Sequence, residues 1–402
     1  MPRMRLRDHA SFQRFLASRV LSSMAFQGTG IAIGWLVYDR THNAFDLGLI
    51  GLVQFLPMLV LTFVVGHVAD QFDRRRIGLI CQIVEASVVA IIALGVWQGW
   101  LSTPGIFVAV AVLGAAQAFE RPTMAALLPG LMPSSMLQSA IAISTSFMQA
   151  AFIAGPTMGG LLYGVHPVAP FAAAAMMFLV ASLCVSSIAK AERVPVRSKP
   201  TLSSVFAGIA FIHSKPVLLG TISLDLFAVL LGGATALLPM FARDILHAGP
   251  WALGLLRAAP AVGAVTMSLV LARFPLRHNV GKTMLGAVAL FGVATLVFSL
   301  SSNIALSIAA LVTLGAADTV SVVIRSSLVQ LLTPDEMRGR VNAVNSLFIG
   351  TSNQLGEFES GMAAALLGPV GAGVFGAVGT LVIVALWAGL FPSLRKVDTL
   401  EG

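Results

Sequence analysis

Long apolar runs recur along the whole chain, and they constrain its fold more than any other feature of the sequence. Each run is long enough to cross about 30 Å of hydrocarbon as a helix that rises about 1.5 Å per residue. Of the 402 residues, 57% are hydrophobic and only 10% are charged, and the mean hydropathy is +0.90. A water-soluble domain with these values would expose large apolar patches. The sequence therefore predicts an all-α integral membrane protein.

Twelve such runs can be delimited, and helices suit them better than strands because a helix satisfies its own backbone polar groups inside hydrocarbon. They cover residues 12–38, 44–69, 77–98, 103–127, 136–164, 168–189, 216–242, 250–273, 281–300, 303–330, 340–366 and 369–391. Residues 1–11 carry no small-residue cleavage site, so we expect no removable signal peptide. Cys81 and Cys184 both fall inside predicted spans, which argues against a disulfide framework or a metal site.

Basic residues set the predicted orientation, because cytoplasmic loops of membrane proteins are enriched in lysine and arginine. With the N-terminus inside, Arg40 and Arg243 face outwards. The cytoplasmic segments then hold a much larger basic set: Arg3, Arg5, Arg7, Arg14, Arg74, Arg75, Arg76, Lys190, Arg193, Arg197, Lys199, Lys215, Arg273, Arg277, Lys282, Arg338, Arg340, Arg395 and Lys396. Both termini are expected in the cytoplasm. The net charge of +8 reflects topology and attraction to membrane lipids, and it does not indicate nucleic-acid binding.

The longest polar interruption, residues 190–200, divides the chain almost equally. We expect an N-terminal six-helix bundle over 1–189, a cytoplasmic linker with a short amphipathic helix over 190–215, and a C-terminal six-helix bundle over 216–402. At an offset of 201, the first half matches the second at Pro133, Met136, Ala142, Phe147, Gly155 and Gly160, which correspond to Pro334, Met337, Ala343, Phe348, Gly356 and Gly361. These matches favour a duplicated unit, and chance agreement between apolar spans is the alternative.

A charge cluster between the second and third predicted spans carries the motif Gly66-x-x-Ala69-Asp70-x-x-Asp73-Arg74-Arg75-Arg76. Gly66 permits two helices to approach closely, and Asp70 near a helix end can accept from the N-terminus of a neighbouring helix. Arg74 and Arg75 can pair with acidic groups at the inner rim. A solvated stop-transfer run would explain the arginines but not the glycine and the aspartate.

Twelve spans in two halves, with this motif after the second span, resemble the major facilitator superfamily of membrane transporters. The resemblance implies two pseudo-symmetric six-helix bundles around a central cavity, and a cytoplasmic gate that the motif latches in the outward-facing state. Asp73 stands where the family commonly has glycine. The residues expected at the gate, including two at the inner end of the fourth span, are Gly66, Asp70, Arg74, Arg75, Glu120 and Arg121.

The fifth predicted span carries a second signature, Gly155-Pro156-Thr157-Met158-Gly159-Gly160, which resembles the core of the superfamily's antiporter motif. The glycines allow close helix packing, and Pro156 removes a backbone donor so that the helix can bend. Ala142 and Ala151 stand where the family motif has further glycines. By resemblance the motif points to export, and tight packing alone is the alternative.

Segments in both halves resemble the branch of bacterial enterobactin exporters and related secretion effectors. They are Phe119-Glu120-Arg121-Pro122, Leu127-Leu128-Pro129, the run from Thr333 to Arg340, and the run from Gly356 to Gly361. This resemblance implies a multi-pass protein of the bacterial inner membrane. It is specific for the branch and not for a substrate, so a siderophore, a drug-like amphiphile and a secreted metabolite all remain open as the exported small molecule.

Ionisable groups at span depth are costly and should face a cavity or a partner. Asp225 lies about 14 Å along its predicted span and is the first candidate for proton coupling. Asp318 and Arg325 share one face of the tenth span and are expected to join Asp225 in a network. Glu357 and Glu359 cannot share a helix face, and we expect Glu357 to face the cavity. An intramembrane ion pair is the alternative for each candidate. Other charges at span depth are Arg19, Glu85 and Arg257.

These features favour a proton-coupled exporter in which two bundles rock about a site near the membrane midplane. Its expected partners are a small-molecule substrate, protons and membrane lipids, and we expect a monomer without cofactor or metal. An uptake or lipid-handling carrier of the same fold is the alternative, followed by a receptor or scaffold without transport. The sequence lacks a zinc-binding His-Glu-x-x-His, a phosphate-cradling glycine loop and a serine elbow, so an enzyme is disfavoured.

Overall fold

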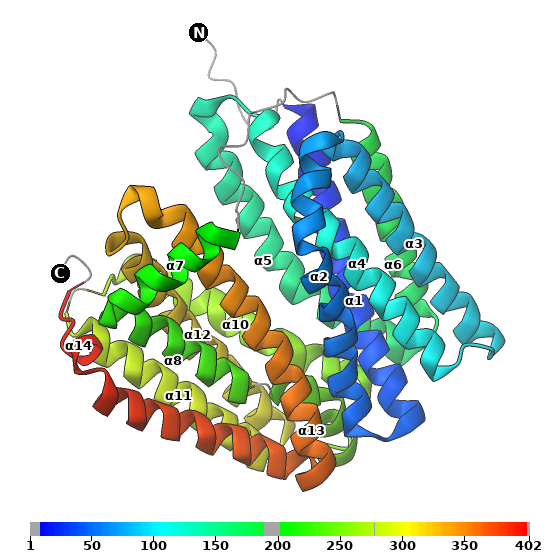
Figure 1. The fold of residues 1–402 in the computed structure, drawn as a ribbon. Coiled ribbons are helices and arrows are strands. Elements are labelled where there is room, and N and C mark those ends of the chain that lie inside the picture. The colour runs from blue at the N-terminus through cyan, green and yellow to red at the C-terminus, as the bar shows by residue number, and fades with distance from the viewer. Residues whose placement is uncertain (1–8, 189–201, 233, 277, 400–402) are drawn as a thin grey trace. The chain divides into compact units, whose positions relative to one another are not determined.

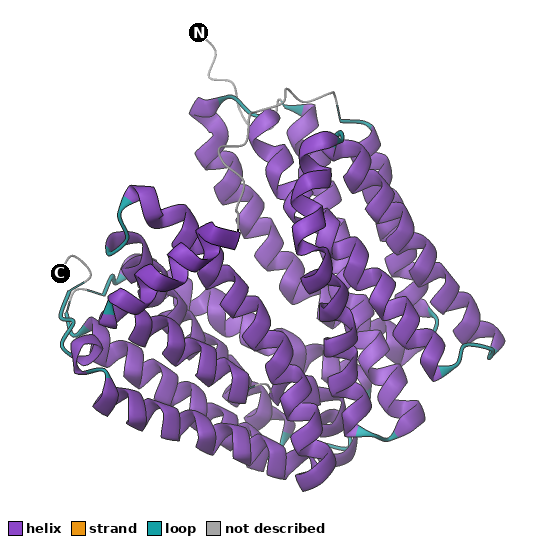
Figure 2. Ribbon diagram, viewed as in Figure 1, coloured by secondary structure: helices purple, strands orange, loops and turns teal. Residues whose placement is uncertain are grey.

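A computed structural model shows helices joined by short loops, with no strand in the ranges that it describes, which are residues 9–188, 202–232, 234–276 and 278–399 (Figures 1 and 2). The helices are α1 (Ala10–Thr41), α2 (Ala44–Gln71), α3 (Arg74–Gln98), α4 (Thr103–Leu127), α5 (Ser134–Val165), α6 (Ala169–Ser186), α7 (Leu202–Ser214), α8 (Pro216–Leu231), α9 (Leu238–Met240), α10 (Pro250–Arg273), α11 (Val280–Leu300), α12 (Ile304–Leu331), α13 (Asp335–Leu390) and α14 (Pro392–Arg395). The polar linker over 190–200 lies outside the described residues.

Within the described ranges, 11 helical stretches are long and apolar enough to cross a membrane. One of them belongs to α13, in which Gly368 has φ 74° and ψ 169°, a conformation that no helix contains. Pro369 follows it and cannot donate a backbone hydrogen bond to the preceding turn. Figure 1 shows the two arms of α13, orange and red, meeting at an angle. With these arms counted separately, the twelve predicted spans are present, and the predicted all-α membrane class is confirmed.

Local sequence explains several helix ends. The Asn303 side chain accepts from the backbone N–H groups of Ala305 and Leu306, and so caps the start of α12. Ser102 caps α4 in the same way through Gly105. At the C-terminal end of α3, Gly99 has φ 76°, a left-handed conformation that suits glycine.

The described chain forms two units by its internal contacts. Unit 1 comprises residues 1–42, 52–198 and 248–258, and unit 2 comprises residues 43–51, 199–247 and 259–402. The first turns of α2 therefore pack with unit 2, and the first turns of α10 pack with unit 1. The expected bundle boundaries at 1–189 and 216–402 stay a prediction.

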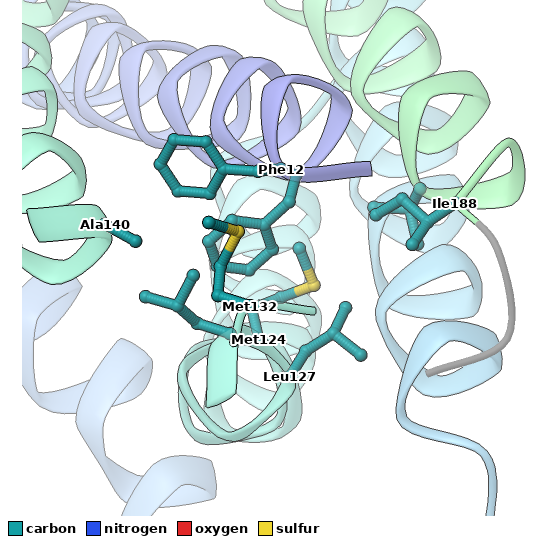
Figure 3. Packing of buried hydrophobic residues seen from close by; sticks show 9 residues of the cluster. Phe12, Met124, Leu127, Met132, Ala140 and Ile188 are labelled. Atoms are coloured by element: carbon teal, nitrogen blue, oxygen red, sulfur yellow. The ribbon is translucent and has the colours of Figure 1, made fainter. Parts of the chain in front are cut away.

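One end of unit 1 is held by a cluster of buried apolar side chains (Figure 3). Phe12 of α1, Met124 and Leu127 of α4, Met132 after it, and Ile188 after α6 are each 6% exposed or less. Such packing holds helices together by van der Waals contact. The cluster fixes α1, α4 and the end of α6 around the polar residues described below.

The amphipathic helix expected over residues 201–214 is present as α7. Its Ile212 is buried in a cluster with Val341 and Val344 of α13. Gly208 lies so close to α13 that a methyl group there would be 2.9 Å from the Arg340 carbonyl oxygen. Helix α7 therefore packs against α13 within unit 2.

Glycines related by the offset of 201 make equivalent helix contacts in the two units. A methyl group on Gly155 of α5 would lie 2.9 Å from the Met24 carbonyl oxygen in α1. One on Gly356 of α13 would lie 2.8 Å from the Leu230 carbonyl oxygen in α8. These contacts place the matched residues in corresponding positions, which supports the duplication.

Candidate functional site

A buried carboxylate in unit 1, Glu120 of α4, is surrounded by hydrogen-bond donors from three helices. Its Oε1 accepts from Ser22 Oγ of α1 at 2.7 Å and from Gln82 Nε2 of α3 at 2.8 Å. Its Oε2 accepts from Gln117 Nε2 at 2.9 Å, one turn earlier in α4. Glu120 is only 5% exposed, so these donors replace the water that an ionised carboxylate needs.

A second buried carboxylate, Glu85 of α3, shares a donor with Glu120. The Gln117 carboxamide nitrogen also donates to Glu85 Oε1 at 2.7 Å, while Gln117 Oε1 accepts from Arg121 Nε at 2.8 Å. Glu85 is completely buried, and its Oε2 has no hydrogen-bond partner among the described residues. One carboxamide therefore links two carboxyl groups to an arginine.

This network borders a cavity of about 320 Å³ inside unit 1. The volume falls at the lower end of the range typical of small-molecule sites. Three helices supply the walls, and the lining residues are Arg19, Ser22, Ser23 and Phe26 of α1, Gln117, Glu120, Arg121 and Met124 of α4, and Ser144, Thr145, Met148, Gln149 and Phe152 of α5. Glu120 and Arg121, which the sequence assigned to the gate, thus lie at a cavity.

The arginines of the gate motif hold helix ends. Arg74 Nη1 donates to the Ala126 carbonyl oxygen near the end of α4 at 2.8 Å, and Arg75 donates to the carbonyl of Ile188. Such bonds satisfy carbonyls that a helix end leaves without intrahelical donors. Gly66 and Asp70 belong to α2, but the surroundings of these two residues lie outside what the structure describes. The gate role of all these residues stays a prediction.

Asp73, where the family commonly has glycine, begins α3. Its Oδ1 accepts from the backbone N–H of Arg75 at 3.0 Å, and its Oδ2 pairs with the Arg75 guanidinium at 3.1 Å. Partial burial alone would raise the pKa of Asp73, but the hydrogen bonds and charge of Arg75 outweigh it and lower the pKa below 3.8. The departure from the family pattern is therefore an N-cap.

The antiporter-like motif packs α5 against α1 and against the first turns of α10, which belong to unit 1. A methyl group on Gly159 would lie 2.5 Å from the Gly28 carbonyl oxygen of α1, and one on Gly160 would lie 2.8 Å from Gly254 Cα of α10. Pro156 lies inside α5, and its carbonyl oxygen faces Gly254. The motif therefore provides close backbone contact on two faces of one helix.

In unit 2, Asp225 of α8 and Arg325 of α12 form a buried ion pair. They are 6% and 4% exposed. Asp318 of α12 lies within electrostatic range of both, and it lines a small cavity with Asp225 and Ser321. The structure thus brings together the three residues that the sequence grouped, and the ion pair that was the alternative for each candidate is present between Asp225 and Arg325.

Glu357 and Glu359 of α13 have different surroundings. The Glu357 carboxylate lies against Gly51 of α2 within unit 2, where a methyl group on the glycine would be 2.9 Å from Oε2. Glu359 Oε2 accepts from Ser360 Oγ at 3.4 Å. The structure separates them as expected from their spacing, and the choice of Glu357 as the cavity-facing residue stays a prediction.

Sequence reasoning missed the neutral members of the unit 1 network, Ser22, Gln82 and Gln117. The available signal was a glutamine inside an otherwise apolar span, which is costly unless it meets a partner. Gln82 and Glu85 are three residues apart on α3, and Gln117 and Glu120 are three apart on α4. This spacing places each pair on one face of its helix, and it could have identified the faces of α3 and α4 that lie against each other.

The model of the transmembrane secretion effector family, a major facilitator family, matches residues 6–401. The chain belongs to this family. As a family member it is a secondary transporter and not an enzyme, and it is a multi-pass membrane protein.

Among similar sequences, the enterobactin exporter EntS of Citrobacter koseri is 25% identical over 97% of this chain and 94% of the relative. The exporter of the same name from Escherichia coli O1:K1 / APEC is 24% identical over the same shares.

Two solved structures show the same fold. A variant of the nucleoside transporter NupG has a TM-score of 0.76 at 12% identity and covers 95% of this chain and 100% of that one. A bacterial homologue of the lysosomal transporter Spinster has a TM-score of 0.75 at 14% identity and covers 96% and 97% of the two chains. The predicted superfamily resemblance is thus confirmed for this secretion effector.

Proposed function

We propose that this secretion effector is a proton-coupled exporter of a small amphiphilic molecule, working by alternating access in a bacterial cytoplasmic membrane with both termini inside. The observation that carries the proposal is the buried Asp225–Arg325 ion pair with Asp318 beside it. Protonation of Asp225 removes its attraction for Arg325, so proton binding can shift unit 2 between two states. A proton shifts the equilibrium between two conformations only if it binds one of them more tightly than the other. A buried ion pair that is intact in one conformation and broken in the other would provide that difference in proton affinity.

Two further observations support export and the gate. The similar sequences carry the name enterobactin exporter, and the Gly155-Pro156-x-x-Gly159-Gly160 motif resembles that of antiporters. We propose Gly66, Asp70, Arg74 and Arg75 as the cytoplasmic gate, because the basic motif follows the second span as it does elsewhere in the superfamily.

The test uses purified protein in sealed liposomes that contain a pH-sensitive dye. With an imposed pH gradient, addition of enterobactin or 2-naphthoate should move protons in the wild type. Asp225→Asn should lose this probe-dependent proton movement, because the amide cannot release a proton. Asp46→Asn, in the first turn of α2, is the control for removal of one carboxylate and should retain it.

Two results would contradict the proposal. Full coupling in Asp225→Asn would remove that residue from the mechanism, and Asp318→Asn, Glu357→Gln and Glu359→Gln would then be compared in the same assay. In cells, loss of an exporter should raise the internal level of its substrate. A lower internal level in the deletion strain would show uptake instead.

A further inference from the structure

We propose that the cavity of unit 1 binds an anionic group of the transported molecule, with Arg19 and Arg121 as its cationic contacts. This inference rests on the proposed transport function and deepens it by naming the substrate class. The class is amphiphiles that carry a carboxylate, sulfonate or phosphate beside an aromatic or aliphatic body.

The first support is that both arginines are available at the cavity wall. Arg19 stacks on the Phe15 ring at 5.8 Å, and Arg121 lies over the Phe26 ring at 5.4 Å. Among the described residues, Arg19 makes no hydrogen bond, and Arg121 donates only through Nε to Gln117. The terminal nitrogens of both guanidinium groups therefore remain for a ligand, and arginine presents them in a fork that matches anionic oxygens.

The second support is the charge of the cavity. Glu120 faces the cavity but is already saturated by Ser22, Gln82 and Gln117, and no described arginine pairs with it within 4.0 Å. Glu85 lies behind it, completely buried, and shares its only donor with Glu120. The residues that line the cavity include two arginines and one carboxylate, so the lining carries a net positive charge.

The third support is an unpartnered polar atom on a residue that lines the cavity. Ser144 of α5 lines it, is 3% exposed, and its Oγ has no hydrogen-bond partner among the described residues. A buried hydroxyl without a partner is costly, so a partner is expected in the loaded protein. An anionic oxygen held by Arg121 across the cavity can accept from this hydroxyl.

Other residues that line the cavity suit the apolar body of an amphiphile. Phe26, Phe152, Met148 and Met124 contribute aromatic and thioether surface. Aromatic and methionine side chains adapt to ligands of different shape. A cavity lined by two cations and by apolar side chains is suited to select amphiphiles by charge more strictly than by shape.

The test is equilibrium binding to the purified full-length protein in detergent, with four probes that share one ring system. The anions are 2-naphthoate, 2-naphthalenesulfonate and 2-naphthyl phosphate, and 2-naphthamide is the neutral counterpart. We expect at least one anion to bind roughly tenfold or more tightly than the amide, since a hydrogen bond to a charged group is worth about that factor. Arg19→Gln and Arg121→Gln should each remove most of this preference by weakening anion binding far more than amide binding.

Two further variants keep the outcome interpretable. Arg121→Lys retains the charge and should keep part of the preference. Arg14→Gln, on the same helix as Arg19, removes an arginine that donates to the Ser187 carbonyl oxygen and does not line the cavity, so it should bind like the wild type. Size-exclusion elution confirms that each variant is folded.

Several outcomes would overturn the inference. They are equal affinity for anions and amide, no binding of any anion up to about 10 mM, or unchanged anion binding in Arg19→Gln and Arg121→Gln. Transport is measured separately in liposomes. Loss of anion preference with intact proton-coupled transport would refute only this inference. Intact anion binding without proton movement would refute only the proposed transport mechanism.

Discussion

At the scale of single residues, unit 1 and unit 2 stabilise a buried carboxylate in different ways. Glu120 is surrounded by neutral donors from α1, α3 and α4, whereas Asp225 has a cation, Arg325. Hydrogen bonds from neutral donors do not depend on a charge of the donating partner. An ion pair instead depends on the charge of both partners. Unit 1 therefore holds its carboxylate in a network of neutral donors, and unit 2 holds its carboxylate in a contact that depends on charge.

Asp398 gives a prediction outside the spans. Its pKa lies below 3.8, first because the Asn279 backbone N–H donates to Oδ1 and next because His278 bonds Oδ2, with Lys282 nearby. A lowered pKa means that the contact contributes fully above the unfolded value and is lost as pH falls through the folded value. The attachment of the C-terminal segment to the start of α11 should therefore persist from pH 8 to about pH 5 and weaken only below 3.8.

Hydrogen–deuterium exchange at Val280 and Gly281 measures this attachment, because their N–H groups donate to the carbonyls of Asp398 and Val397. Asp398→Asn should speed exchange there at neutral pH. An unchanged exchange rate in this variant would show that the backbone bonds suffice without the carboxylate.

At the scale of helices, glycines determine how closely α5 approaches its neighbours. Gly159 touches the backbone of α1 at Gly28, and Gly160 touches that of α10 at Gly254. Backbones at this separation leave no room for a side chain, and they gain van der Waals contact that larger residues would prevent. The close packing that was the alternative explanation of the motif is therefore observed. A role of the motif in export remains a proposal.

Gly159→Ala should destabilise the protein by about 1 to 3 kcal/mol, because its methyl group would overlap backbone atoms that cannot rotate away. Gly164→Ala is the matched control on the same helix, since nothing lies within 4 Å of a methyl group there. Alanine also favours helix over glycine, so the control should be neutral or slightly more stable. Thermal unfolding in detergent compares the two variants, and equal midpoints would contradict the close contact.

The sequence was sufficient to place the spans, because length and hydropathy determine which segments enter a membrane. It also grouped Asp225, Asp318 and Arg325, since a charge in hydrocarbon requires a partner and few were available. It did not place Glu120 at a cavity. The spans are apolar on all sides, so periodicity does not show which face meets which neighbour, and the partners Ser22 and Gln82 come from helices far away in sequence.

At the scale of the whole molecule, orientation follows from the basic loops and is open to direct measurement. Phe72, beside the gate arginines, and Trp100, between α3 and α4, are 59% and 55% exposed and lie at opposite ends of α3. In a Cys81→Ala/Cys184→Ala background, a membrane-impermeant maleimide should label Trp100→Cys in intact spheroplasts. It should label Phe72→Cys only in everted vesicles, and the reverse pattern would invert the predicted topology.

The three-helix surroundings of Glu120 also have a consequence for biosynthesis. Its hydrogen bonds come from α1, α3 and α4. If any of these helices is missing, the carboxylate loses hydrogen-bond donors that replace water. We therefore expect α1, α3 and α4 to associate early during membrane insertion, before the later helices are added.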